Sequence, residues 1–172
     1  MTEKILEIIK NNKVNIVGEV ISNFKFSYEF YGEKFYYFYV SISRRSKIND
    51  VIPVLVSDRI IDVSKDLTGK DVEVIGDYRS YNSHKNGKMK LLLYVFTHEI
   101  HVLNKSIEVS ENNKIFLDGF ICKKPIYRKT PLGREITDLL LAVNRPYSDL
   151  TDYIPCICWN KNARYAQGLM VG

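Results

Sequence analysis

The residue types that most often carry metal or nucleophilic chemistry are few in this sequence and do not fall at diagnostic spacings. Its three cysteines are odd in number and lack the CxxC spacing of a zinc ribbon: Cys122, Cys156 and Cys158. His98 and His101 lie three residues apart, but no Cys or carboxylate cluster completes a metal site. No Ser/His/Asp arrangement, phosphate-binding loop or dinucleotide motif is readable. The sequence therefore predicts a protein that is not an enzyme and binds no metal or cofactor.

Aromatic rings and positive charge give a stronger chemical signal. The 172 residues include 12 Tyr, 8 Phe and 1 Trp, many of them beside Lys or Arg, and the formal net charge is +5. This balance points mildly toward a polyanionic partner, although many soluble proteins carry as much charge without one. The only tryptophan lies in DYIPCICWNKN (152–162), whereas a similar stretch earlier in the chain, NDVIPVLVSDR (49–59), has no aromatic residue. The difference between these two stretches is the main clue to function.

The two stretches belong to a longer internal repeat. Pro53 lies in the earlier stretch and Pro155 in the later one, 102 positions apart. Three other pairs of residues, given below, are 101 positions apart, so the proline pair requires one inserted residue. Landmarks that recur in the same order at a fixed interval indicate two copies of one structural unit. Three further pairs are each separated by 101 positions: Gly18 and Gly119, Gly32 and Gly133, and Arg44 and Arg145.

Each copy has the pattern of a small β-barrel. Phe38, Val40 and Ile42 alternate with polar and tyrosine residues, which is typical of a half-buried strand. The first copy is predicted to hold five strands, with a short helix at 58–66 between the third and the fourth. This order predicts an all-β chain of tandem OB-folds, each a five-stranded Greek-key barrel, with short helices. The predicted strands are 14–24, 35–44, 52–56, 71–80 and 90–98.

The second copy stops before its last two strands. The predicted organisation is an N-terminal helix (1–13), a first OB domain (14–104), a linker (105–113) and a second OB domain (114–172) that ends after a helix at about 162–167. An open half-barrel would leave strand edges unpaired. We therefore expect the chain to be a piece of a longer protein, or its missing strands to come from another subunit.

Three motifs of the second copy resemble bacterial single-stranded DNA-binding proteins of the SSB family. They are PIYRKTPLG (125–133), LLLAVNRPY (139–147) and DYIPCICWNKNA (152–163), in order over about sixty residues. The resemblance implies that Tyr147, Tyr153 and Trp159 stack on bases, at about 1–3 kcal/mol per base. The cations near these rings are the candidates for phosphate contacts: Arg128, Lys129, Arg145 and Lys161.

The first copy lacks this stacking set, since Ser46, Val51 and Ser57 occupy the corresponding positions. It has other aromatic and basic residues on its second and fourth strands and in the loop after the second strand. These could form a different stacking surface, or the two tyrosines could be buried between barrels or between subunits. The candidates are Tyr37, Tyr39, Arg44, Arg45 and Arg79.

The sequence thus favours largely sequence-independent binding of single-stranded DNA in replication, repair or recombination. The alternatives are an OB-fold protein-interaction module of a replication or primosome complex, or a binder of single-stranded RNA. The expected partners are single-stranded DNA and replication proteins, and the resemblance implies a homodimer for a complete chain. The N-terminus has no signal or membrane-spanning run, so a cytoplasmic, nucleoid-associated location is expected.

Overall fold

The computed structural model describes residues 10–104 and 112–172, which form two compact units. We call them the N-terminal unit, which is the described part of Asn12–Phe116, and the C-terminal unit, which is Leu117–Gly172. Most of the predicted helix over 1–13 and of the predicted linker over 105–113 lies outside the described residues. Residues 12 and 13, which the sequence assigned to that helix, instead begin a strand.

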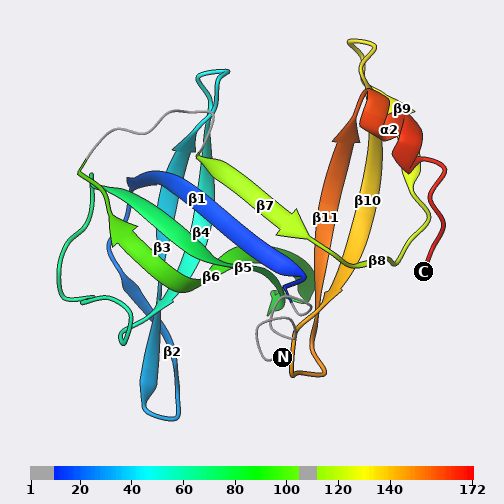
Figure 1. Ribbon diagram of the computed structural model, residues 1–172. Helices are drawn as coiled ribbons and strands as arrows, with labels where there is room; N and C mark the ends of the chain where they lie inside the picture. The colour runs from blue at the N-terminus through cyan, green and yellow to red at the C-terminus, as the bar shows by residue number, and fades with distance from the viewer. Residues whose placement is uncertain (1–9, 105–111) are drawn as a thin grey trace, which may run out of the picture. The chain divides into compact units, whose positions relative to one another are not determined.

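The N-terminal unit contains a closed five-stranded barrel (Figure 1). Its seven-stranded sheet has the order β2-β3-β4-β6-β5-β1-β7, and β1 also pairs with β3, which joins the two sides of the sheet. The pair β4 and β6 is parallel. This closure confirms the predicted all-β OB-fold. The strands are β1 (Asn12–Val20), β2 (Lys25–Phe30), β3 (Glu33–Ser43), β4 (Asn49–Ser57), β5 (Asp71–Lys85), β6 (Lys88–Val102) and β7 (Asn113–Leu117).

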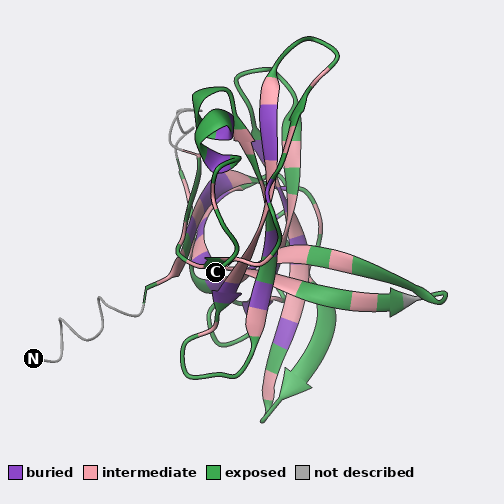
Figure 2. Cartoon of the chain, turned by 90° about the vertical axis from the view of Figure 1, so that its right-hand side faces the viewer, coloured by how far each residue is buried: buried purple, intermediate pink, exposed green. Residues whose placement is uncertain are grey.

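The core of this unit follows from the alternation in β3. Phe38, Val40 and Ile42 are completely or almost completely buried, as predicted. They pack against Val54 of β4 and Val95 of β6 in one apolar cluster, and strand residues between them face outward. Figure 2 shows this alternation as buried and exposed bands along the strands. The outward side chains of β3 from Tyr37 to Ser43 are therefore at least partly exposed.

The short helix predicted over 58–66 is wrong, since the backbone there forms turns. The Asp62 carboxylate accepts hydrogen bonds from the backbone N–H and the hydroxyl of Ser64, and Asp66 accepts one from the N–H of Thr68. Asp and Ser side chains that bond to nearby backbone groups compete with helix formation. The polar residues of this segment thus favour turns.

Within the residues that the structure describes, the C-terminal unit has a four-stranded sheet and one helix. Its strands pair in the order β11-β10-β8, and β9 pairs with β10. The Thr137 hydroxyl of β10 donates to the backbone oxygen of Ala163 at 2.7 Å, which fastens the helix to the sheet. The helix agrees with the sequence prediction. The elements are β8 (Phe120–Ile121), β9 (Ile126–Lys129), β10 (Glu135–Asn144), β11 (Thr151–Trp159) and α2 (Lys161–Ala166).

The start of the second copy divides between the two units. The sequence assigned residues 114–117 to the second domain, but β7 pairs with β1 in the sheet of the N-terminal unit. The first half of β1 is the part of the first copy that corresponds to β7, and it pairs with β5. The described part of the C-terminal unit holds no strand that corresponds to β5, so this segment finds its backbone partners on β1 instead.

The repeat is visible in the backbone register. Hairpin β3–β4 and hairpin β10–β11 are equivalent: Ser41 pairs with Val51 as Ala142 pairs with Tyr153. A Cβ on Gly119 would lie 2.6 Å from the Ala142 backbone oxygen. Gly18 approaches the Ser41 oxygen in the same way, so both glycines are required where the first strand crosses the second. The two units share one architecture.

Candidate nucleic-acid interface

Strand β11 presents its aromatic residues on one face. Its odd-numbered residues from Tyr153 to Trp159 are exposed, whereas Asp152 and Ile154 are buried. Tyr153 is 43% exposed and Trp159 is 47% exposed. Both residues therefore keep roughly half of their surface exposed to solvent.

The strand paired with β11, β10, presents apolar side chains beside these rings. Residues paired across an antiparallel ladder share a face. Trp159 pairs with Ile136, and Tyr153 pairs with Ala142. Ala142 has only a single methyl group, which is a small neighbour for the Tyr153 ring. The outer face of this sheet therefore offers two flat rings at opposite ends of β11.

Phe120 is a third ring on this face that the sequence did not indicate. It pairs with Ala142 from the side opposite Tyr153, and it is exposed. Strands lie about 4.8 Å apart, so Phe120 and Tyr153 flank Ala142 at about 10 Å from strand to strand. A strand of only two residues has no readable alternation. The only sequence signal was the position of Phe120 directly after Gly119, where the strand must cross β10 closely.

Tyr147 lies apart from the sheet, in the loop between β10 and β11. It is 88% exposed and has a φ of 58°, in the left-handed region that a tyrosine rarely adopts. Such a conformation directs the ring into solvent at the cost of some backbone strain. The predicted stacking residues thus occupy two places, the face of β11 and the loop before it.

The predicted cations of the C-terminal unit differ in their placement. Arg128 pairs with Ile136 in the same row as Trp159, so it lies on the aromatic face. Its Nε donates to the Asp138 carboxylate at 2.8 Å, and this hydrogen bond raises the pKa of the exposed guanidinium. Lys129, one residue on, belongs to the opposite face of β9. Lys161 is exposed at the start of α2.

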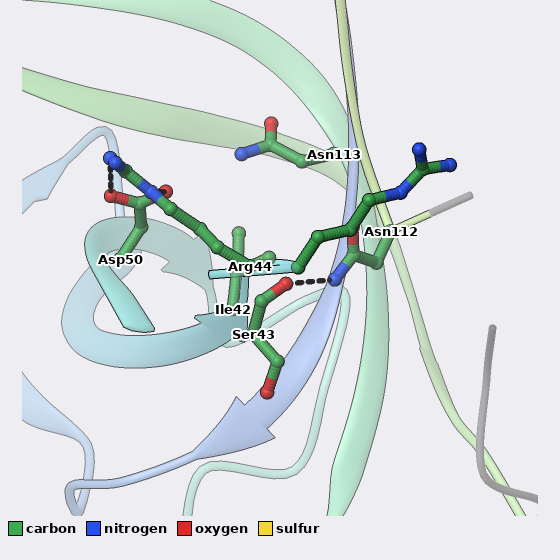
Figure 3. A pocket seen from close by; sticks show the side chains of 7 residues that line it. Ile42, Ser43, Arg44, Asp50, Asn112 and Asn113 are labelled. Carbon is green, nitrogen blue, oxygen red and sulfur yellow. Dashed lines mark hydrogen bonds and ion pairs between the residues drawn. The ribbon is translucent and has the colours of Figure 1, made fainter. Parts of the chain in front are cut away.

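Arg145 has a role within its hairpin. It donates two hydrogen bonds to the Asp152 carboxylate at 2.8 and 2.7 Å, and Asp152 is only 1% exposed. Arg44 makes the equivalent paired contact with Asp50 in the first copy (Figure 3). That pair is more open, since the Arg44 side chain is 57% exposed and that of Arg145 is 20% exposed. The repeated landmark arginines therefore each hold the base of a hairpin.

The candidates of the first copy lie in three places: on β3, on β5, and at a pocket at the end of β3. Tyr37 and Tyr39 are half-buried on the outward phase of β3, with ring centroids 6.1 Å apart. Arg79 of β5 places its guanidinium 3.7 Å from the centroid of the Phe96 ring and pairs with Asp77. Arg45 instead lines a pocket at the end of β3 together with Arg44, Asp50 and Asn112 (Figure 3).

The cysteines and histidines form no such grouping. Cys122, Cys156 and Cys158 are free, and burial raises the pKa of the Cys156 and Cys158 thiols. Within residues 10–104 and 112–172, no cluster of three or more His, Cys, Asp or Glu side chains is placed to hold a metal ion. No helix in the same part of the chain is long and apolar enough to cross a membrane.

Comparison with known proteins places the C-terminal segment in a family. Residues 112–171 match the model of the Single-strand binding protein family. Among curated proteins, a single-stranded DNA-binding protein of Halalkalibacterium halodurans is 38% identical over 56 residues, which cover 30% of this chain and 33% of that protein. Single-stranded DNA-binding protein 2 of Listeria innocua is 33% identical over 63 residues, which cover 34% and 40%. The matches thus span about a third of the relatives' length.

Solved structures extend the likeness in fold to most of the chain. The wild-type single-stranded DNA binding protein of Thermus aquaticus has a TM-score of 0.74 at 20% identity, covering 94% of this chain and 80% of that one. A deletion mutant of the Thermus aquaticus protein has a TM-score of 0.69 at 22% identity, covering 94% and 81%. At these identities the likeness concerns the OB-fold alone. The family resemblance predicted from the three motifs is nevertheless confirmed where it was seen, and residues 112–171 belong to the single-strand binding protein family.

Proposed function

We propose that this chain binds single-stranded DNA without catalysing a reaction, and largely independently of sequence, in replication, repair or recombination. The observation that carries the proposal is the outer face of the C-terminal sheet, where Trp159 and Tyr153 are half-exposed and Phe120 is exposed. Every base has a flat π face, so such rings bind bases of any identity. The family of residues 112–171 supports the same ligand.

The rings are spaced to hold different bases along one strand. Tyr153 and Trp159 are six residues apart on β11, which corresponds to about 20 Å at about 3.4 Å per residue. Phe120 adds a ring beside Tyr153, and Tyr147 extends the surface from the loop. We propose that each ring stacks on a base for about 1–3 kcal/mol.

Phosphate contacts complete the proposed interface. Arg128 lies in the row of Trp159 and can exchange the exposed Asp138 carboxylate for a phosphate, because both are anionic acceptors for the same guanidinium. That Lys129 and Lys161 contact phosphates stays a prediction: both are exposed, but Lys129 belongs to the face of β9 opposite the rings. That Arg145 contacts a phosphate stays a prediction; its ion pair with Asp152 also holds the loop that carries Tyr147.

The test uses Trp159, which is the only tryptophan and therefore reports on this face alone. Oligo-dT is expected to quench its emission, and affinity should fall steeply with salt, since bound cations release counterions from the DNA. Labelled oligo-dT followed by fluorescence anisotropy should bind the Trp159→Leu variant about fivefold or more weakly, one stacking contact being lost. The matched control is Tyr165→Leu, an exposed aromatic on α2 outside the sheet. Unchanged emission and no anisotropy change at low salt would disprove DNA binding.

Two finer features belong to the same proposal. We propose DNA over RNA as ligand, which direct comparison of dT and rU oligomers decides: tighter binding of rU would reverse the assignment. We also propose that a complete chain assembles as a homodimer, acts with replication proteins and localises with the nucleoid. Light scattering of the purified protein with and without oligo-dT measures the assembly.

A further inference from the structure

The N-terminal unit carries its own aromatic surface on the sheet face that corresponds to the stacking face of the C-terminal unit. The register equivalence places Val51 where Tyr153 stands and Ser57 where Trp159 stands, so β4 has no ring there. On β3, Ser41 pairs with Val51 and brings no ring, but two other residues of the same face do. Tyr39 pairs with Pro53, and Phe35 pairs with Ser57. The rings of the first copy therefore lie on the same sheet face as those of the second copy, but on β3 rather than on β4, the strand equivalent to β11.

A β-bulge adds further rings to this face. Lys25 pairs with Tyr37 and Phe26 with Tyr36, but the register then shifts and Tyr28 pairs with Phe35. With strict alternation Tyr28 would share the face of Phe26; the bulge at Ser27 places it on the face of Phe35. Hairpin β9–β10 of the second copy pairs without such a shift. Of the two equivalent hairpins, only that of the first copy contains the bulge, and the bulge moves the Tyr28 side chain to the opposite face of β2.

The rings on this face form a continuous column. Tyr28 and Phe35 are stacked with centroids 4.8 Å apart and an interplanar angle of 18°. Phe35 and Phe96 follow with centroids 6.0 Å apart at 30°. The Arg79 guanidinium closes the column 3.7 Å from the Phe96 centroid. Phe35 itself is buried, so it supports the exposed Tyr28 ring from behind.

The charge of this face suits a polyanion. Lys25 shares the face of Tyr37, and Arg79 lies at the far end of the ring column. Two acidic side chains nearby have cationic partners, since Glu33 pairs with Arg59 and Asp77 with Arg79, so a phosphate at Arg79 would compete with the Asp77 carboxylate. An apolar protein partner would use the rings but not the flanking cations. Rings and cations together favour a single-stranded polynucleotide.

We infer that the N-terminal unit binds single-stranded DNA through a tyrosine surface formed by Tyr28, Tyr37 and Tyr39, with Lys25 and Arg79 beside it. The chain then has two stacking surfaces that use the same sheet face but different strands. This inference rests on the proposed function, because it assumes that the C-terminal unit binds the same strand. Only the C-terminal surface contains a tryptophan, so binding at the tyrosine surface leaves Trp159 emission unchanged.

The test compares oligomers that fill one surface or both. A single OB barrel covers about 4–16 nucleotides, so dT of about 8 nucleotides occupies one unit and dT of about 30 can span both. The variant Tyr28→Leu/Tyr37→Leu should bind the long labelled oligomer at least about fivefold more weakly for each ring lost. Quenching of Trp159 by the short oligomer should keep its midpoint. Tyr28→Phe/Tyr37→Phe keeps both rings and should restore the affinity for the long oligomer.

The matched control is Phe26→Leu, an exposed ring of the same strand on the opposite face. Equal weakening by Phe26→Leu and Tyr28→Leu would indicate a general defect of the hairpin and overturn the inference. So would unchanged long-oligomer affinity of the double variant, or loss of self-association without loss of DNA affinity. If wild-type protein binds neither oligomer, the proposed function itself fails, and that result is distinguishable from the others.

Discussion

The ion pair repeated in the two hairpins allows one perturbation to be compared at two levels of burial within the same molecule. Asp152→Asn keeps the side-chain volume but removes the charge that faces the Arg145 guanidinium. Asp152 is 1% exposed and accepts two hydrogen bonds from Arg145. Breaking a buried ion pair from one side costs about 3–5 kcal/mol, because it leaves an uncompensated charge. Arg145 retains some contact with water, so we expect a cost near the lower end, about 3 kcal/mol.

Asp50→Asn is the matched substitution in the other hairpin. The Arg44 side chain is 57% exposed and that of Asp50 is 26% exposed, against 20% and 1% for Arg145 and Asp152, so water replaces the lost partner at little cost. We expect no change beyond measurement error. The two substitutions remove the same chemical group at equivalent positions of one repeated hairpin, and they differ mainly in how far that group is buried.

Hydrogen exchange measured by mass spectrometry separates the two hairpins by peptide. A loss of about 3 kcal/mol should speed the exchange of protected amides in 135–159 about 100-fold in Asp152→Asn, at roughly 1.4 kcal/mol per tenfold. Amides in 33–57 should keep their rates in both variants. Equal acceleration in the two hairpins, or an effect under about 1 kcal/mol for Asp152→Asn, would refute the role assigned to burial.

Two further predictions concern the backbone crossing and the response to acid. Gly119→Ala should destabilise the C-terminal unit by more than about 2 kcal/mol, because the added methyl group meets the Ala142 oxygen; urea unfolding followed by Trp159 emission measures this loss. Gly168→Ala is the control and should be close to neutral, since its added methyl group would meet nothing nearer than 3.6 Å. Equal effects of the two substitutions would contradict the explanation. Burial alone would raise the pKa of Asp77, but hydrogen bonds and charges from His98 and Arg79 outweigh it and hold the pKa below its usual value. The lowered pKa of Asp77 stabilises the fold above the unfolded pKa of about 3.9, and this stabilisation is lost as pH falls through the folded pKa. Asp77→Asn should therefore narrow the difference in melting temperature between about pH 6 and pH 2. An unchanged difference would argue against the assignment.

The sequence could reveal the barrel because burial alternates along β3 from Phe38 to Ile42. Phe38, Val40 and Ile42 are buried to within 1% exposure, and that burial produces the alternation read from the sequence. The glycine landmarks could be recognised for a similar reason. Gly18 and Gly119 stand where only a hydrogen atom fits, so both copies of the unit require glycine there.

Other elements left no readable pattern. Strand β2 is exposed along its whole length, so its residues have no apolar phase to distinguish it from a loop. The segment 58–66 forms turns through carboxylate contacts to the backbone, which depend on local geometry rather than on hydrophobic period. Phe120 belongs to a two-residue strand. The ion pair of Arg145 and Asp152 joins residues seven apart, and finding it requires the register of the hairpin.

The comparison of the two copies shows why stacking residues were harder to locate than core residues. A core position is fixed by its neighbours in three dimensions, whereas a surface ring need only lie on the correct face of a sheet. Residues paired across an antiparallel ladder share that face, so a ring can be exchanged between partners without leaving the surface. In the C-terminal unit the ring is Trp159 and its partner is Ile136, whereas the equivalent pair of the N-terminal unit is Ser57 and the buried Phe35, which supports the exposed Tyr28 ring. Position-by-position comparison therefore reports a lost aromatic set in the first copy, whereas comparison by cross-strand pairs finds aromatic rings on the partner strand of the same face.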